Sequence, residues 1–173
     1  MSETNGNRGR SADAFADALA ELKEQGSMLL LAGRGHDALE AACEQLLGEA
    51  GPERRRRLFV LTDRTPTHAQ SVEPTHTIAY DLPVRSAAAT TAGSEAPERT
   101  VDGDLGDLQA AIGDAVAAID REARGLDPAE LRVCLDSADC LLAAHDRESL
   151  FRFVHALSGV VRDANAMCHV HLP

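Results

Sequence analysis

The sequence is short of aromatic residues and of lysine. It has no tryptophan, one tyrosine and four phenylalanines among 173 residues, and Lys23 is its single lysine. Its 28 acidic residues outnumber the 17 basic ones, which gives a formal net charge of −11. Because a nucleic-acid-binding face should be basic, this balance argues against nucleic acid as a partner.

Long apolar runs and paired cysteine motifs are also missing. No window reaches the roughly 18 apolar residues of a membrane span, and residues 1–10 lack the apolar core of a signal peptide. The cysteines form no C-x-x-C pair and lie in apolar segments (Cys43, Cys134, Cys140 and Cys168). We therefore expect a cytoplasmic protein without a membrane segment, whose cysteines are reduced and buried.

The acidic excess comes with arginine in place of lysine and with many small residues. This composition resembles that of proteins from a salt-loaded cytoplasm, where the Debye length falls to about 3 Å near 1 M salt. Dense negative surface charge is screened under those conditions. A high-GC genome also favours alanine and arginine and is the alternative explanation. The negative sign of the net charge favours the explanation that the protein comes from a salt-loaded, halophilic cytoplasm.

Apolar runs alternate with amphipathic stretches along the chain. The predicted strands are 27–32, 58–62, 76–82, 131–135 and 167–172, and the predicted helices are 11–25, 38–47, 105–124 and 147–162. This alternation predicts a three-layer α/β/α fold with a mostly parallel sheet of about five strands. We expect residues 1–10 to be disordered and residues 11–173 to form one domain. Residues 84–104, rich in small and turn-forming residues, are expected to be a flexible insertion.

A glycine-containing turn, residues 33–37, follows the first predicted strand, where nucleotide-binding α/β proteins place their phosphate loop. A working loop needs G-x-x-x-x-G-K-[ST], whose lysine reaches the β/γ-phosphates and whose hydroxyl holds Mg²⁺. The turn, with Gly33 and Gly35, has neither group. Asp37 adds negative charge at the helix N-terminus and can cap it. The favoured interpretation is a structural turn, and an anion held by backbone N–H groups is the alternative.

These elements resemble the first part of RecA- and KaiC-like ATPases of the P-loop NTPase superfamily. Residues 26–35 resemble their first strand and phosphate loop, and residues 131–137 resemble their Walker B strand, with Asp136 in the place of the Walker B aspartate. Residues 130–142, 151–153 and 169–173 look closer still to a group of uncharacterised proteins of halophilic archaea, often described as RecA-like or KaiC-like. The missing Walker A groups imply a degenerate member of that class.

Two histidines, His169 and His171, alternate on the last predicted strand and therefore face the same side of it. Such a pair occurs in zinc sites, with Cys134, Asp136 or a distant histidine as further ligands. A catalytic zinc needs three protein ligands, and the sequence fixes no third. The favoured interpretation is a histidine pair near the carboxyl edge of the sheet, hydrogen-bonded to Asp136 or Asp139. No metal ligand is predicted.

Two other groups of residues are candidates for catalysis or for binding a partner. Ser137, Cys134 and His169 form a nucleophile–base set only if they lie on adjacent strands. The four arginines at 54–57 can contact an acidic partner or nucleic acid. Because acidic residues flank them at positions 49 and 53, they are interpreted as a solvated turn with local ion pairs.

These features predict a non-catalytic regulatory or protein-interaction module, for which the resemblance suggests a role in signal transduction. It would carry no cofactor and would bind a protein partner. Its assembly as a monomer or a homo-oligomer stays open. The alternative is a nucleotide-binding protein or weak ATPase that uses ATP and Mg²⁺, with Gly33, Gly35 and Asp136 at the nucleotide.

Overall fold

The structure is a computed structural model that describes residues 21–22, 24–33, 36–48, 55–62, 74–82 and 98–172. Several predictions made from the sequence fall outside these ranges. They are the disorder of residues 1–10, most of the helix at 11–25, most of the insertion at 84–104, and Gly35. The backbone of Asp37 is described, but its side chain, and with it the predicted helix cap, is not.

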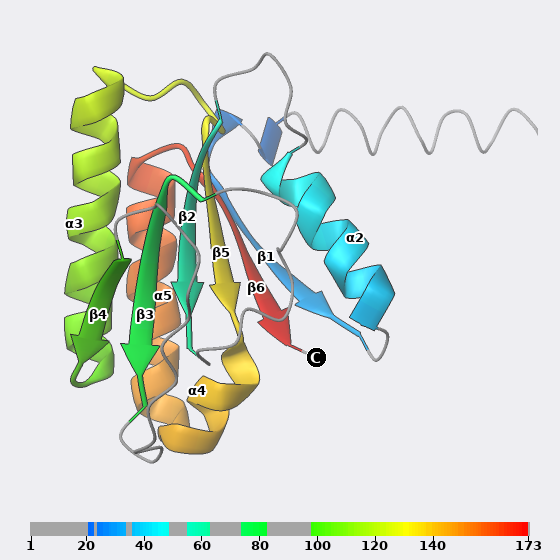
Figure 1. Cartoon of the computed structure of the whole chain (residues 1–173), viewed down its shortest axis with the longest axis vertical. Coiled ribbons are helices and arrows are strands. Elements are labelled where there is room, and N and C mark those ends of the chain that lie inside the picture. Colours follow the sequence, from blue (N-terminus) through cyan, green and yellow to red (C-terminus); the bar gives the residue numbers. More distant parts are fainter. Residues whose placement is uncertain are drawn as a thin grey trace, which may run out of the picture.

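The described strands form one parallel sheet in the order β1-β6-β5-β2-β3-β4, as Figure 1 shows. Their bounds are β1 Ser27–Ala32, β2 Arg56–Leu61, β3 His76–Asp81, β4 Glu98–Asp102, β5 Leu131–Asp136 and β6 Met167–Leu172. The predicted α/β fold with a parallel sheet is confirmed.

The sequence predicts about five strands, whereas the described sheet has six. The missed strand is β4, which lies at the end of the segment interpreted as an insertion and, among the described strands, pairs with β3 alone. Because β4 is an edge strand, it buries one apolar side chain, Val101, and exposes Arg99 and Thr100. A sequence with one buried apolar residue in five gives almost no strand signal.

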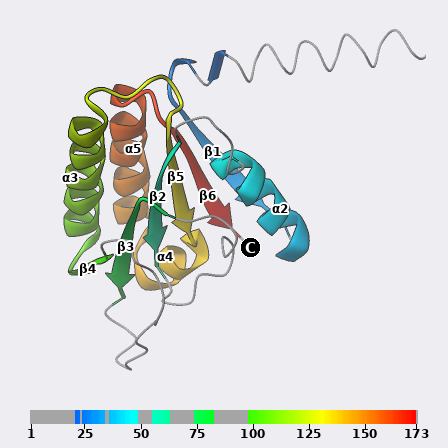
Figure 2. The same cartoon turned by 45° about the horizontal axis from the view of Figure 1, so that its top comes forward.

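Helices cover both faces of the sheet. Helix α2 (His36–Leu47) lies on one face, and α3 (Leu105–Ala123) and α5 (Arg147–Asp163) lie on the other (Figures 1 and 2). The short α4 (Ala138–Ala144) follows β5. The chain crosses from β1 to β2 through α2 and returns from β4 to β5 through α3. Right-handed crossovers in opposite directions place their helices on opposite faces, which explains the three layers.

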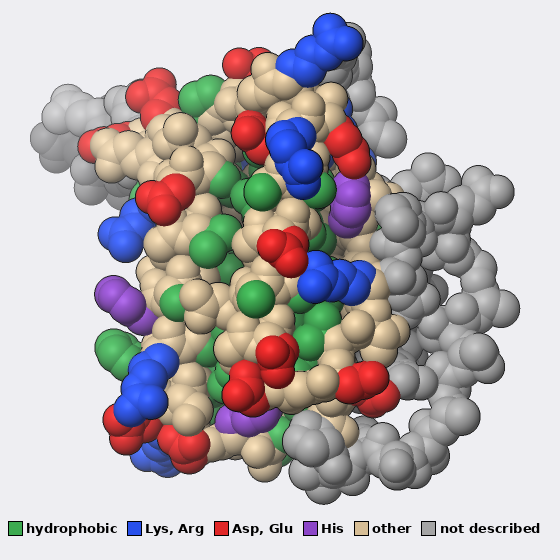
Figure 3. Space-filling view, turned by 90° about the vertical axis from the view of Figure 1, so that its left-hand side faces the viewer, with side chains coloured by type: hydrophobic (Ala, Val, Ile, Leu, Met, Phe, Trp, Pro, Cys, Tyr) green, Lys and Arg blue, Asp and Glu red, His purple; other side chains and the backbone are tan. Residues whose placement is uncertain are grey.

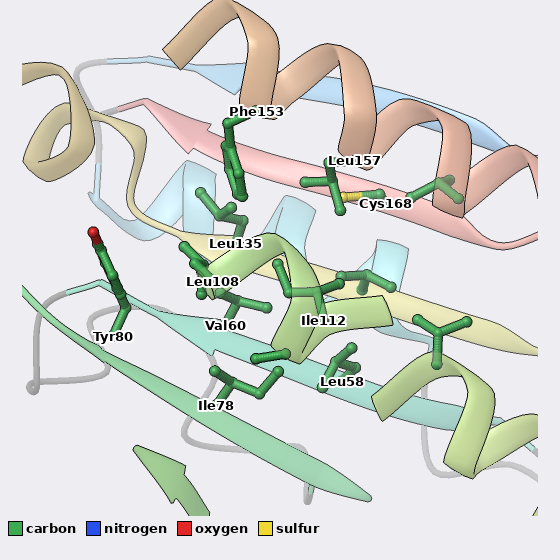
Figure 4. Close-up of a cluster of buried hydrophobic side chains, with 14 of the residues drawn as sticks. Leu58, Val60, Ile78, Tyr80, Leu108, Ile112, Leu135, Phe153, Leu157 and Cys168 are labelled. Carbon is green, nitrogen blue, oxygen red and sulfur yellow. The ribbon is translucent and has the colours of Figure 1, made fainter. Parts of the chain in front are cut away.

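The larger core lies between the sheet and the α3 and α5 helices (Figure 4). It consists of apolar side chains from both layers, among them Leu58, Val60, Ile78, Leu108, Ile112, Leu135 and Leu157. A smaller cluster lies under α2 and contains Cys43, Leu47, Phe59 and Cys134. The α2 face therefore holds sulfur where the other face is mainly hydrocarbon.

Two of the four consecutive arginines open β2 and contact their own domain. Arg57 donates from Nε to the carbonyl of Leu47 at 3.3 Å and from Nη2 to that of Gly48 at 2.9 Å. A cation there satisfies the last carbonyls of α2 and its dipole. Arg56 lies 3.6 Å from Glu130. Local pairing agrees with the sequence interpretation, but Arg56 and Arg57 lie in a strand and not in a turn.

Acidic and basic side chains are interspersed on the face that Figure 3 shows. Arg99 of β4 pairs with Asp114 of α3 at 3.1 Å, and Arg152 pairs with Glu148 one turn earlier on α5. Exposed pairs of this kind contribute little to stability. Among the described residues, no helix combines the length and the apolar character needed to cross a bilayer.

Candidate metal centre

Four side chains that can bind a metal ion come together beneath α2. Cys43 projects from the middle of α2, Cys134 from β5, and His169 and His171 from β6. Their donor atoms, two Sγ and two imidazole nitrogens, all lie within 4.8 Å of one another, and all four residues are buried. We call these four residues the Cys/His cluster.

The topology brings these residues together. Cys134 pairs in register with His169 across β5 and β6, so the two side chains share one face of the sheet. His171 is two residues further along β6 and shares that face. On α2, Leu39, Cys43 and Leu47 recur every four residues and are buried, which places Cys43 on the stripe that faces the sheet.

The spacing of the donor atoms suits a tetrahedral metal. The Sγ of Cys43 lies 3.2 Å from Nε2 of His169 and 4.0 Å from the Sγ of Cys134. The Sγ of Cys134 lies 3.9 Å from Nε2 of His171. With zinc–sulfur bonds of about 2.3 Å and zinc–nitrogen bonds of about 2.0–2.1 Å, a tetrahedron separates its ligand atoms by about 3.3–3.8 Å. Small side-chain shifts therefore bring all four donors to bonding distance.

A buried carboxylate stands behind one of the histidines. Oδ1 of Asp136 lies 3.4 Å from Nδ1 of His171, and both residues are almost fully buried. Metal-binding histidines commonly turn their second ring nitrogen toward a carboxylate, which fixes the ring and its tautomer. Of the histidine pair predicted to hydrogen-bond to Asp136 or Asp139, His171 lies beside Asp136. The carboxylate of Asp139 instead accepts a hydrogen bond from the hydroxyl of Ser137.

The pKa shifts in the cluster favour a negatively charged Cys43 next to a positively charged His171. The hydrogen bond with Cys134 lowers the pKa of Cys43 well below its usual range, against the effect of burial, and contacts with His169 and His171 add to it. The same bond and burial raise the pKa of Cys134. Burial alone would lower the pKa of His171, but Asp136 and Cys43 outweigh it and raise the pKa to about 9. The site thus stabilises a buried thiolate, the form that binds metals.

The structure describes two of the three residues that the sequence predicts at a nucleotide, Gly33 and Asp136. The N–H of Gly33 donates to the carbonyl of Leu172 at 3.4 Å, so this donor already has a protein acceptor. Gly35 is outside the described residues. Asp136 faces His171 under α2. Nucleotide binding at these three residues stays a prediction.

The possible nucleophile–base set is brought together only in part. Cys134 and His169 do lie side by side on adjacent strands. The hydroxyl of Ser137 points elsewhere, since it donates to Asp139 and lies 3.8 Å from the Sγ of Cys140. The described geometry therefore does not direct this serine at His169.

Sequence reasoning missed Cys43 as a member of the site. It treated this cysteine as an ordinary buried residue, which its burial agrees with. The sequence did contain one signal for Cys43. This cysteine lies on the apolar stripe of the helix that connects β1 to β2, so it had to face the sheet. The sequence does not give the register between β5 and β6, so it could not show that Cys134 and the histidines lie under that stripe.

Residues 26–173 match the model of a family described as a family of unknown function (DUF7504). No curated protein and no solved structure matches the chain.

Proposed function

This chain belongs to the family of unknown function DUF7504, and we propose that it is a non-catalytic metal-binding module that holds one Zn²⁺ in the Cys/His cluster. The observation that carries the proposal is the convergence of two thiols and two imidazoles, all buried and with donor atoms within 4.8 Å of one another. These donors come from three elements that are separate in sequence.

The donor chemistry favours zinc. Two thiolates with two imidazoles are a common ligand set of structural zinc sites, whereas Mg²⁺ and Ca²⁺ prefer oxygen. The charge balance also suits a buried position, because two thiolates neutralise the two positive charges of the ion. Burying a neutral centre avoids the large cost of burying an isolated charge.

The number of ligands supports a non-catalytic role. Four protein ligands complete a tetrahedron and leave no open position for water or substrate, whereas catalytic zinc keeps one open. A metal held in this way would tie α2 to β5 and β6. This is the kind of centre that suits a regulatory or protein-interaction module, and a role in signal transduction belongs to the same proposal.

Cobalt substitution tests the proposal. Reduced protein should bind one Co²⁺ per chain and develop the ligand-field bands of a tetrahedral site with sulfur-to-cobalt charge transfer, and Zn²⁺ should displace the cobalt. Cys43→Ser should weaken binding and reduce the charge-transfer band.

Cys168→Ser is the matched control, because Cys168 is a buried thiol of the opposite core. It should keep the full spectrum, and circular dichroism should verify that both variants fold. Absence of stoichiometric binding, or an unchanged spectrum in Cys43→Ser, would overturn the proposal.

A further inference from the structure

The two thiols of the Cys/His cluster touch each other. The Sγ atoms of Cys43 and Cys134 are 4.0 Å apart and come from residues 91 positions apart in the chain. One lies on α2 and the other on the sheet. A bond between them would therefore join the helix to the strand beneath it.

The two remaining cysteines are placed differently. Cys168 belongs to the core on the α3 and α5 side, where Figure 4 shows it near Leu157. Successive residues of a strand point to opposite faces, so Cys168 and His169 lie on opposite sides of the sheet. Cys140 is in α4, where its Sγ lies 3.8 Å from the hydroxyl of Ser137. Cys43 and Cys134, by contrast, make a direct sulfur–sulfur contact.

We propose that the centre is redox-regulated: a hydroperoxide oxidises Cys43 and Cys134 to a disulfide, and the metal ion leaves. This inference rests on the proposed metal-binding function. It adds that the bound state of the module depends on the oxidation state of two of its ligands.

The reaction balances with hydrogen peroxide as the oxidant. One thiolate attacks the O–O bond, which forms a sulfenic acid and releases hydroxide. The second thiolate attacks the sulfenic sulfur, which forms the S–S bond and releases a second hydroxide. Two thiolates together lose two electrons, and the peroxide gains them. The metal is left with two imidazoles of its four ligands and dissociates.

The geometry sets what must move. A disulfide has an S–S length of about 2.05 Å, so the sulfurs approach each other by about 2 Å from their 4.0 Å contact. His169 and His171 are fixed on β6, whereas Cys43 lies on a helix that contributes few side chains to the core. The oxidised and metal-bound forms therefore differ in how α2 sits on the sheet, which gives the module two states.

The test uses full-length protein loaded with Zn²⁺ and treated with hydrogen peroxide. A chromogenic chelator should report release of one zinc per chain while the number of free thiols falls from four to two. Peptide mapping should find Cys43 joined to Cys134, and a thiol reductant with added Zn²⁺ should restore binding.

A Cys140→Ser/Cys168→Ser variant retains Cys43 and Cys134 as its only cysteines. It should still release one zinc and lose all its free thiols. This variant keeps the ligand set intact and so avoids the risk that a ligand mutant fails to fold.

Retention of zinc after peroxide treatment would overturn the inference, as would oxidation confined to Cys140 or ending in sulfinic acid without a disulfide. Each of these results leaves the metal-binding function standing. If the reduced protein binds no metal, the proposed function fails as well, so the two failures are distinguishable.

Discussion

At the scale of single residues, the side of the sheet decides what a cysteine does. Cys168 is buried among hydrocarbon side chains, and desolvation raises the pKa of its thiol to about 12. Cys43 is equally buried, but hydrogen bonds with Cys134 and two imidazoles lower the pKa of its thiol instead. Burial therefore does not make a thiol inert when its neighbours can stabilise the thiolate.

The role of Asp136 is also decided at this scale. Asp136→Asn keeps the size of the side chain and removes its charge behind His171. If Asp136 orients that ring, zinc affinity should fall about 10- to 100-fold, the usual cost of losing an outer partner of a metal ligand. Competition with a chromogenic chelator measures the change.

Asp139→Asn serves as the control for the loss of one nearby carboxylate, because Asp139 contacts Ser137 and not the histidines. It should leave zinc affinity unchanged. Equal affinities for all three proteins would argue against the orienting role of Asp136.

At the scale of elements, local signals fix where the helices begin and end. Asp104 and Asp107 form a reciprocal capping box at the start of α3. Asp146 caps α5, and its carboxylate accepts from the backbone N–H of Ser149 at 2.9 Å. At the far end of α2, Arg57 contacts the last carbonyls. Each of these three helix ends uses a charge that suits the helix dipole.

The cap of α5 predicts a pH dependence of stability. The backbone N–H of Ser149, with its hydroxyl, lowers the pKa of Asp146 below its ordinary value. A lowered carboxyl pKa adds stability above the unfolded value of about 3.9, and this stability is lost as the pH falls through the folded value. Asp146→Ala should therefore lower the melting temperature at neutral pH, and the gap to the wild type should shrink near pH 3.

Asp146→Asn is the matched variant, since asparagine also caps helices but carries no charge. Its difference from Asp146→Ala should not depend on pH. Thermal melts of the three proteins from about pH 7 down to pH 3 measure both gaps. A constant gap between the wild type and Asp146→Ala would contradict the assignment.

At the scale of the whole molecule, the sheet separates two unequal cores. Among the described residues, most of the buried apolar side chains lie on the α3 and α5 side, and the α2 side holds a cluster of four with Leu61 against it. Hydrophobic packing alone therefore holds α2 less strongly than the other long helices. A metal bound by side chains of α2, β5 and β6 would add to that attachment.

This separation predicts that the two faces contribute independently to stability. Leu157→Ala empties part of the larger core and should cost about 2–5 kcal/mol. Removal of zinc with a chelator should destabilise the wild type through the other face. Because Leu157 and the Cys/His cluster lie on opposite faces of the sheet, the two effects should add to within about 0.5 kcal/mol in denaturant unfolding.

Because Cys43→Ser should bind the metal more weakly, the chelator should change its stability less than that of the wild type, which makes this variant the reference for metal-dependent stability. A chelator effect of equal size in wild type and Cys43→Ser would show that the stabilising metal binds elsewhere. Strong non-additivity with Leu157→Ala would show that the two cores are coupled.

How much the sequence predicts follows from the range of each signal. Helical spacing of Leu108, Ile112, Val116 and Ile119 places α3 within a few residues, because an amphipathic helix is a local pattern. Strand β4 is not predicted from the sequence, because an edge strand with a single buried apolar residue has almost no hydrophobic pattern. The pair of histidines on β6 is also local, and their shared face follows from the strand period alone.

The sequence by itself determined the alternation of strands and helices, and with it a parallel sheet covered on both faces. Only the tertiary structure decided that Cys43 lies over Cys134 and the histidines, because this depends on strand order and on the register between β5 and β6. Those are set by packing over long sequence separations, for which no local pattern exists. The candidate metal centre is therefore a property of the folded chain, assembled from three elements that lie far apart in the sequence.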